Sequence, residues 1–405
     1  MSEKGDSQVS KLSQDFFLHL LRSHDSVEKH FESLSTELDF VYLKELSIRH
    51  NTLPFLASLI SFLPENFISP AQKKEFFEES RTHVLRSLQL AREYTRISDL
   101  LTSSEIPHLP YKGPALAELY YDDPPLRCCS DLDIVVPKEM AVRSLWVLAE
   151  NGFLPAFGLG QSRLADLPRI TNHFMMIHPT QGWGVEIHWA LFKEWQQIPF
   201  DLDPYWQKAG TAQEQPPARF SDEDLLVILC GHALKHSWDQ VKWVMDLDRI
   251  IRSCENLDWQ KVVALAKELG LMRGLKSGLL LADMTFATPL PDFLSQQSKH
   301  DKQVINIVSE IKKRWLLPEG EKNSYPCKIK FFLHSRERLR DKLLMCFKYA
   351  FSPELEDYLT WDFGQRVFLY RLLRPFTVIR KSFGFGPELP PIEGRQKGHD
   401  WGEIP

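Results

Sequence analysis

The feature that most constrains the fold is a change of periodicity at about Ile106. From about 10 to 101, apolar residues recur every three or four positions, as one buried face of a helix requires. Between Ile106 and Trp189, short apolar runs separated by Pro, Gly and Asn replace this pattern and predict strands. Helical patterns return after Ser221. The sequence therefore predicts an α+β fold, mostly helical, with one small mixed sheet flanked by N-terminal and C-terminal helical subdomains.

These changes also predict where the chain divides. We expect an N-terminal helical region (1–104), an α/β core (105–205), a helical subdomain that closes a cleft (206–300), a C-terminal helical region (301–385) and a mobile tail (386–405). The core should contain strands near 107–111, 131–136, 173–178 and 184–189, and helices near 114–121 and 138–151. The only strands predicted thus lie in the second of these five regions.

Composition excludes some classes of protein. A formal net charge of -5 argues against a general polyanion binder, so nucleic acid is an unlikely partner. Six cysteines without CxxC spacing suggest reduced thiols and no zinc site. The first residues lack an apolar signal region, and no run of about 18 apolar residues occurs. We therefore expect a cytoplasmic protein without a membrane span; its oligomeric state is left unknown.

Two carboxylates open the apolar strand that ends at Val136. Alternate side chains of a strand share a face, so Asp131 and Asp133 should point the same way. Two unneutralised carboxylates at the edge of a core would repel each other and resist desolvation. A pair in this position therefore predicts a site for divalent metal ions.

A third carboxylate would allow two magnesium ions about 4 Å apart to be held around a reacting phosphate. Glu186 is the candidate, because it shares a strand face with His188 and a neighbouring strand could bring it beside Asp131 and Asp133. The alternatives are a solvated strand edge for the aspartates and an ordinary hydrogen-bonded pair for Glu186 and His188.

Lys112 and Gly113 precede a predicted helix whose first turn contains Pro114. The exposed amides of that helix start favour an anion, Gly113 allows close approach, and Lys112 adds a positive charge. Arg127 and Ser130, just before the aspartates, could supply a guanidinium and a hydroxyl to the same phosphates. An ordinary loop before a helix remains the alternative for the Lys-Gly pair.

The combination resembles the uncharacterised nucleotidyltransferase family of the polymerase-beta-like superfamily, from about Phe40 to Pro291. That family combines a KG helix start, an R-x-x-(S/G)-D-x-D strand and a later (D/E)-x-H-W strand. This chain has them at 112–113, 127–133 and 186–189. A further H-x-x-K-H-x-W helix element is matched by His232, Lys235, His236 and Trp238.

The resemblance implies a nucleotidyltransferase palm in which Asp131, Asp133 and Glu186 are catalytic and hold two Mg²⁺ ions, with Mn²⁺ as the alternative. Lys112 and Gly113 take the place of the superfamily's Gly-Ser turn, so Lys112 or Ser130 must replace the missing hydroxyl. The expected reaction moves an NMP from an NTP to a small-molecule or protein acceptor. A catalytically silent nucleotide-binding or assembly protein is the alternative, and an RNA-end transferase is a lesser one.

The remaining candidates lie after the core. His232, Lys235 and His236, together with His188 of the core, would line the cleft, whereas the alternative is that His232 and His236 are satisfied core residues. The tryptophans at 238, 243 and 259 favour helix packing over base stacking. The basic segment 312–348 is most simply the solvated face of amphipathic helices, with RNA or an anionic membrane as alternative partners.

Overall fold

The computed structural model describes residues 3–22, 38–65, 67–208, 219–317, 325–361 and 363–383. The described chain is mostly helical and contains one five-stranded mixed sheet, which confirms the predicted α+β class. The strands are β1 (Leu109–Pro110), β2 (Leu132–Val135), β3 (Leu154–Pro155), β4 (His173–Ile177) and β5 (Gly184–His188). Their order in the sheet is β1-β2-β5-β4-β3, and only the β2–β5 pair is parallel.

Four helices precede the sheet: α1 (Glu3–Arg22), α3 (Phe40–Arg49), α4 (Leu53–Ser61) and α5 (Pro70–Ser103). The long helix α5 begins at a capping box, in which the Ser69 side chain accepts from the Gln72 amide and the Gln72 side chain accepts from the Ser69 amide. Its buried Leu90, Ile97 and Leu101 belong to the core beneath the sheet.

Three helices are inserted among the strands: α6 (Gly113–Tyr120), α7 (Ala141–Glu150) and α8 (Gln161–Leu164). The helices after the sheet are α9 (Asp203–Lys208), α10 (Asp222–Lys235), α11 (Val241–Ser253), α12 (Trp259–Glu268), α13 (Met272–Phe286), α14 (Asp292–His300), α15 (Lys302–Trp315), α16 (Tyr325–Ser335), α17 (Leu339–Phe351), α18 (Leu355–Thr360) and α19 (Val367–Ser382). Side chains of Ser221 and Asp258 cap α10 and α12, since each accepts from backbone amides of the first turn.

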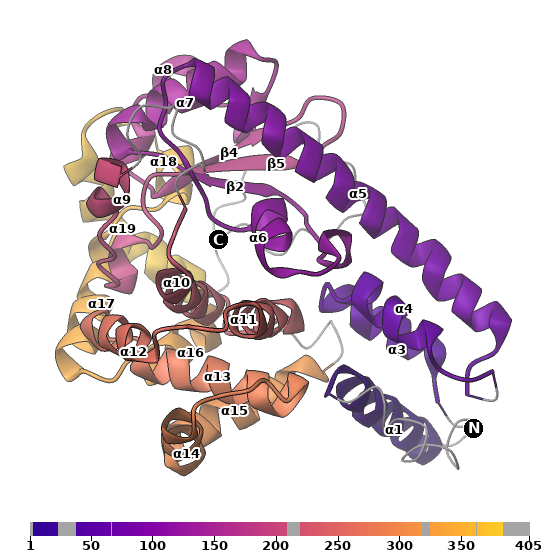
Figure 1. The fold of residues 1–405 in the computed structure, drawn as a ribbon. Helices are drawn as coiled ribbons and strands as arrows, with labels where there is room; N and C mark the ends of the chain where they lie inside the picture. The colour runs from indigo at the N-terminus through magenta and orange to yellow at the C-terminus, as the bar shows by residue number, and fades with distance from the viewer. Residues whose placement is uncertain are drawn as a thin grey trace.

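The two faces of the sheet have different neighbours. Leu132 and Ile134 of β2 and Ile187 of β5 are fully buried in the same core as residues of α5 and α7. The alternate residues point to the other face, where α10 and α11 lie (Figure 1). A sheet covered by helices on one side thus presents its polar residues toward a second layer of helices.

The predicted elements of the core match the structure with two corrections. Asp131 lies just before β2, not inside a strand that starts with it. The two-residue strand β3 was not predicted, because it pairs at the sheet edge through only Leu154 and Pro155. The proposed domain limits stay a prediction, and the tail at 386–405 lies outside the described residues. In the described part of the chain, no helix is long and apolar enough to cross a membrane.

Candidate functional site

The parallel pairing of β2 and β5 fixes the centre of the site. Asp133 lies directly opposite Glu186 in the register, and Val135 lies opposite His188. Alternate residues of a strand share a face, and directly paired residues of neighbouring strands point to the same side. Glu186 and His188 of β5 therefore project to the same face as Asp133. The ligand atoms of Asp133, Glu186 and His188 all lie within 4.8 Å of one another, so two separate strands build one compact polar cluster.

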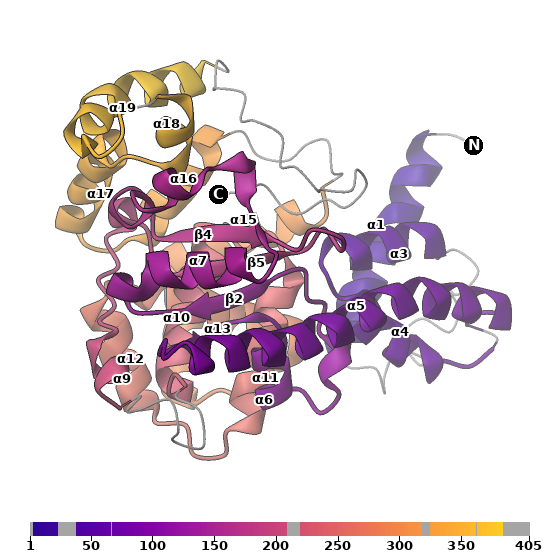
Figure 2. The same cartoon turned by 90° about the horizontal axis from the view of Figure 1, so that it is seen from above.

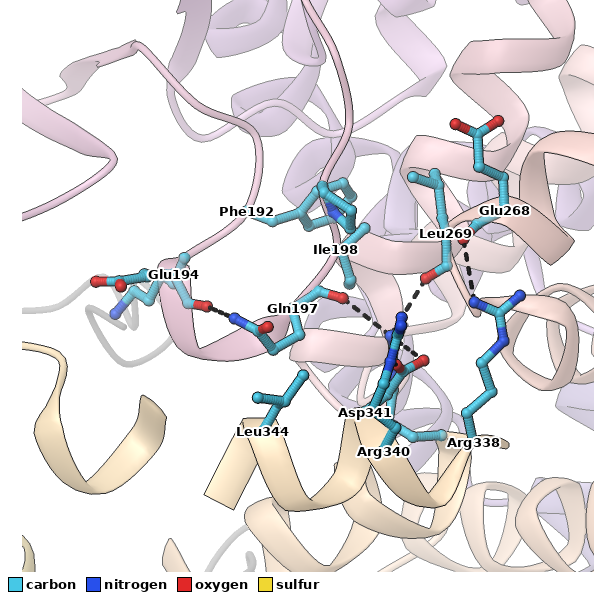
Figure 3. A pocket seen from close by; sticks show the side chains of 13 residues that line it. Phe192, Glu194, Gln197, Ile198, Glu268, Leu269, Arg338, Arg340, Asp341 and Leu344 are labelled. Carbon is cyan, nitrogen blue, oxygen red and sulfur yellow. Dashed lines mark hydrogen bonds and ion pairs between the residues drawn. The ribbon is translucent and has the colours of Figure 1, made fainter. Parts of the chain in front are cut away.

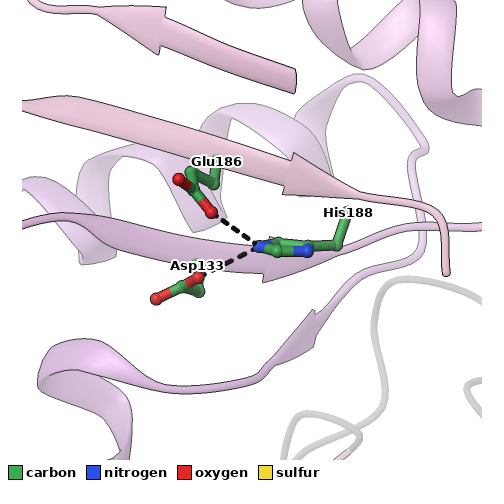
Figure 4. Close-up of side chains that lie close together, drawn as sticks. All are labelled: Asp133, Glu186 and His188. Carbon is green, nitrogen blue, oxygen red and sulfur yellow. Dashed lines mark hydrogen bonds and ion pairs between the residues drawn. The ribbon is translucent and has the colours of Figure 1, made fainter. Parts of the chain in front are cut away.

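His188 joins the two carboxylates (Figure 4). Its Nε2 lies 3.0 Å from Asp133 Oδ1 and 3.2 Å from Glu186 Oε2. Burial alone would lower the pKa of His188, but hydrogen bonds to the two carboxylates outweigh it and raise that pKa. The ring therefore favours the imidazolium form, in which Nε2–H donates to both acids.

Lys112 adds a second cation to the cluster. Its Nζ lies 3.0 Å from Asp133 Oδ1 and 3.4 Å from His232 Nε2. Burial would raise the pKa of Asp133, yet Lys112 and the hydrogen bond from His188 hold it well below the ordinary range. Asp133 is thus a buried anion, 3% exposed, that already has two cationic partners.

Gly113 begins α6 and brings that helix close to the aspartates. Its φ of +66° lies in the left-handed region, and a Cβ there would stand 3.2 Å from the carbonyl oxygen of Asp131. Glycine is therefore required both by conformation and by close approach. The side chain of the N-cap residue Lys112 makes no hydrogen bond to the first turn of α6. The first amides of this helix therefore have no capping side chain from Lys112.

Asp131 stands beside this cluster but outside its compact set. Its Oδ1 accepts from the Ser130 hydroxyl at 2.9 Å. Burial, and then the charges of Asp133 and Glu186, raise the pKa of Asp131 to about 6. Because burial and two nearby carboxylates disfavour the anionic form of Asp131, a cation bound beside it would stabilise that form.

Arg127 occupies a different place from the one the sequence suggested. Its side chain is 3% exposed, and Nε and Nη2 donate to Oδ1 and Oδ2 of Asp246 at 2.7 and 2.9 Å. Nη1 donates to the carbonyl oxygen of Gly113 at 3.2 Å. Tyr121 also donates to Asp246, at 2.7 Å. The guanidinium thus ties α11 to the Lys-Gly turn.

The three candidates on α10 face the cluster from the opposite layer. The His232 ring packs edge-on against the buried Tyr111 ring, and it packs against the His236 ring at a centroid distance of 4.8 Å. Burial, and then the charge of Lys112, lower the pKa of His232 well below its ordinary value. Burial and the charge of Lys193 lower the pKa of Lys235 to about 7. The helix therefore presents a largely uncharged imidazole and a weakly basic amine.

Several contributors were missed from the sequence. His173 of β4 lies opposite His188 in the register, and its Nε2 is 3.8 Å from Glu186 Oε2. The signal was present, because His173 and His188 occupy matching positions at the ends of two adjacent predicted strands. Asp246 and Tyr121 carried no signal, since nothing in sequence spacing pairs them with Arg127.

A cavity of about 280 Å³ lies elsewhere, between the turn after β5 and the start of α17 (Figure 3). Arg336, Arg338 and Arg340 line it, whereas Asp131, Asp133 and Glu186 do not. The buried Arg336 donates through Nη2 to the carbonyl oxygens of Gln197 and Leu269. These bonds fasten the C-terminal helices to the core, so we assign the cavity no role in the chemistry of the carboxylates.

A small mixed sheet with acidic side chains on one face, beside a Lys-Gly helix start, is the arrangement expected of a nucleotidyltransferase. A family model described as uncharacterised nucleotidyltransferase matches residues 36–287, more than half of the chain. The chain belongs to this family, and membership places it among the transferase enzymes. No curated protein and no solved structure matches the chain significantly.

Proposed function

We propose that the protein is a Mg²⁺-dependent nucleotidyltransferase that moves an NMP from an NTP to a hydroxyl or phosphate of an acceptor and releases pyrophosphate. One observation carries the proposal. The β2–β5 register brings Asp133 and Glu186 together beside Lys112 at the start of α6. Carboxylates suited to metal ions and an ammonium suited to phosphate thus lie next to each other, which supports transfer of a phosphoryl-linked group.

The residues fit a divalent ion by their chemistry. Carboxylate oxygens are the donors that Mg²⁺ prefers; Asp133 and Glu186 supply them within the cluster, and Asp131 stands beside it. The pKa of Asp131 is raised first by burial and then by the charges of Asp133 and Glu186, and divalent ions would neutralise these charges. Imidazole suits softer ions, so we assign His188 to hydrogen bonding with the carboxylates instead of to Mg²⁺. When bound, the ions would polarise the α-phosphate and acidify the acceptor hydroxyl.

The chain's own groups perform the other tasks. The amides of the first turn of α6 and the Lys112 ammonium bind the phosphates of the NTP, with Gly113 permitting the approach. The Ser130 hydroxyl, which donates to Asp131 in the structure, would have to release that bond to donate to the same phosphates. Arg127 positions the turn through the Gly113 carbonyl instead of contacting the nucleotide. Glu186 is the base that we expect to take the acceptor's proton.

We assign the acceptor to small molecules or proteins. The net charge of -5 and the acidic cluster disfavour a polyanionic acceptor such as an RNA end, because no excess of positive charge would offset its phosphates. His232, Lys235 and His236, on the layer that faces the carboxylates, are the residues that we expect to contact the acceptor or the nucleotide.

Incubation of the full chain with α-labelled NTPs, Mg²⁺ and candidate acceptors tests the proposal. We expect Mg²⁺-dependent NTP binding in calorimetry, lost in Asp133→Asn and Glu186→Gln. The buried Asp248 of α11, which lies outside the cluster and pairs with Arg252, supplies the control variant Asp248→Asn. The proposal fails if no NTP binds with Mg²⁺, or if all three variants bind alike.

A silent nucleotide-binding protein is the second candidate. It is favoured by one observation: Lys112 and His188 already neutralise Asp133 without any metal. Such a protein would bind NTP with or without Mg²⁺ and would keep that affinity when Asp131 and Asp133 are replaced by Asn. Loss of both metal-dependent binding and label transfer in these variants supports the enzyme instead.

A further inference from the structure

Two neighbouring C-terminal helices, α17 and α19, expose rows of large apolar side chains. On α17, Leu339, Leu343 and Phe347 recur every four residues and are 70%, 63% and 59% exposed. Residues four apart lie on one side of a helix, so these three form a stripe. Phe351 continues it, with its ring 4.9 Å from that of Phe347.

Helix α19 repeats the pattern with more aromatic area. Its stripe consists of Phe368, Leu372, Phe376 and Ile379, followed by Phe383 at the end of the helix, and these side chains are between 55% and 74% exposed. The helix packs on α17 through its other side, where the guanidinium of the buried Arg374 lies 5.7 Å from the centre of the Tyr349 ring. Both helices lie at the corner of the molecule opposite α1 and α4 (Figure 2).

These stripes bear on the expectation for this region. The basic segment 312–348 was expected to be the solvated face of amphipathic helices, with RNA or an anionic membrane as alternative partners, and most of the large exposed side chains of α17 are leucine or phenylalanine. Single exposed apolar residues are ordinary on protein surfaces, whereas contiguous patches mark contact sites. The apolar stripes of these two adjacent helices therefore indicate a binding surface.

The charges beside the stripes indicate the chemistry of the partner that binds them. The two helices together carry seven Lys or Arg residues and a single acid, Asp341. Five of these seven cations are paired with acids of the protein, namely Arg340, Lys348, Arg371, Arg374 and Lys381. The half-buried Lys342 precedes Leu343, the exposed Arg380 follows Ile379, and the ion pairs of the described residues include neither. The apolar stripes are therefore bordered by cations that are available to an anionic partner.

We propose that α17 and α19 dock the protein on an anionic lipid surface. An amphipathic helix with Phe and Leu on one side and Lys or Arg on its flanks inserts its apolar side at the headgroup boundary, while its cations contact anionic lipids. None of the described helices can span a bilayer, so this is attachment to the surface. A second copy of the chain is the weaker fit, because a symmetric pairing would bring the Lys342 and Arg380 side chains of both copies to one interface.

Attachment through this corner would also hold the carboxylate site near the lipid. Helix α18 connects the two docking helices in sequence, and its N-cap residue Glu354 pairs with Lys193 at 2.5 Å. Lys193 lies five residues after His188, and its charge lowers the pKa of Lys235 on the layer that faces the carboxylates. The docking proposal does not depend on the proposed reaction, since it rests on surface residues alone.

Vesicle co-flotation of the full chain tests the proposal. We expect binding to vesicles of phosphatidylcholine mixed with phosphatidylglycerol, little binding to phosphatidylcholine alone, and release at high salt. Phe347→Gln and Phe376→Gln should each weaken partitioning roughly tenfold or more, because each removes one inserted ring. Phe62→Gln is the matched control, since Phe62 is 74% exposed on the distant N-terminal part of the molecule.

The charge contribution is tested by Lys342→Glu combined with Arg380→Glu, which should abolish binding to the anionic vesicles while the melting temperature stays unchanged. Equal binding to both vesicle types overturns the proposal, as does equal binding by the Phe376 and Phe62 variants. A chain that remains unbound but sediments as a dimer, and becomes monomeric in Phe376→Gln, assigns the surface to a second copy and also overturns it.

Discussion

Replacement of Asp246 by Asn tests whether the Arg127–Asp246 pair holds the Lys-Gly turn in place. The two side chains are 4% and 2% exposed and share two hydrogen bonds, at 2.7 and 2.9 Å. Burial would lower the pKa of Arg127, but the Asp246 charge outweighs it and raises that pKa well above the ordinary value. Asn has the same shape without the charge, so the variant leaves the Arg127 cation buried and uncompensated.

Loss of one partner of such a buried pair costs about 3–5 kcal/mol of unfolding free energy. With an unfolding entropy of about 2.1 cal/mol/K per residue, 405 residues that unfold as one unit have about 0.85 kcal/mol/K in total. The expected fall in melting temperature is then about 4–6 °C. Because Arg127 also donates to the Gly113 carbonyl, we expect weaker NTP binding even at temperatures where the variant is folded.

Differential scanning calorimetry and urea titration measure the loss, and Asp248→Asn is the control. Asp248 is equally buried on the same helix, but its charged partners Arg249 and Arg252 are 21% and 40% exposed and can be hydrated when Asp248 is replaced. We expect a loss of only about 1 kcal/mol there, as for a partly exposed ion pair. Arg127→Met combined with Asp246→Leu should recover part of the loss, since it removes both charges. A loss in Asp246→Asn no larger than in the control refutes a structural role for the pair.

Two further changes give separate predictions. Gly113→Ala should lower the free energy of unfolding by about 1 kcal/mol because of the left-handed φ, and should weaken NTP binding because the new Cβ would lie 3.2 Å from the Asp131 carbonyl oxygen. Gly158→Ala is the control for calorimetry: with a φ of +61° and open space around it, it should show the loss of stability alone. The pKa of Lys235 is lowered from 10.5 to about 7 in the folded chain. Between pH 7 and pH 10.5, Lys235 is therefore protonated in the unfolded chain and neutral in the folded chain. The free energy of unfolding falls as the pH drops from 10 to 7. Lys235→Met should therefore gain more stability over the wild type at pH 7 than at pH 10 in urea titrations, whereas Lys138→Met, at an exposed position, should show no such difference.

The sequence predicted the fold well where periodicity carries the information. The alternation around Asp133 and Glu186 specified two strands with polar residues on one face, and the structure pairs these residues directly. Strand β3 was not predicted, because its two residues are too few to show alternation. Local patterns thus predict elements that are long enough to bury a regular face.

The partners of the polar residues could not be predicted in the same way. Arg127 precedes the aspartates by a few residues, which suggested a shared ligand, but its guanidinium turns to Asp246, 119 residues later. That choice depends on how α11 packs under the turn, a tertiary fact without a local pattern. The exposed stripe on α17 was equally invisible, because the spacing of Leu339, Leu343 and Phe347 shows that a helix has an apolar side but not whether the protein covers it.

The arrangement of cations around Asp133 has a consequence for how the site would work. Lys112 and His188 both contact Asp133 Oδ1, so the carboxylate is held in one orientation before any ligand arrives. A divalent ion that binds Asp133 must compete with these two cations, and a triphosphate offers Lys112 a new anion in exchange. Metal and nucleotide should therefore bind cooperatively: each weakens the internal pairing that opposes the other. The Arg127–Asp246 pair, which fixes the turn that carries Lys112, then affects the affinity for both ligands without touching either.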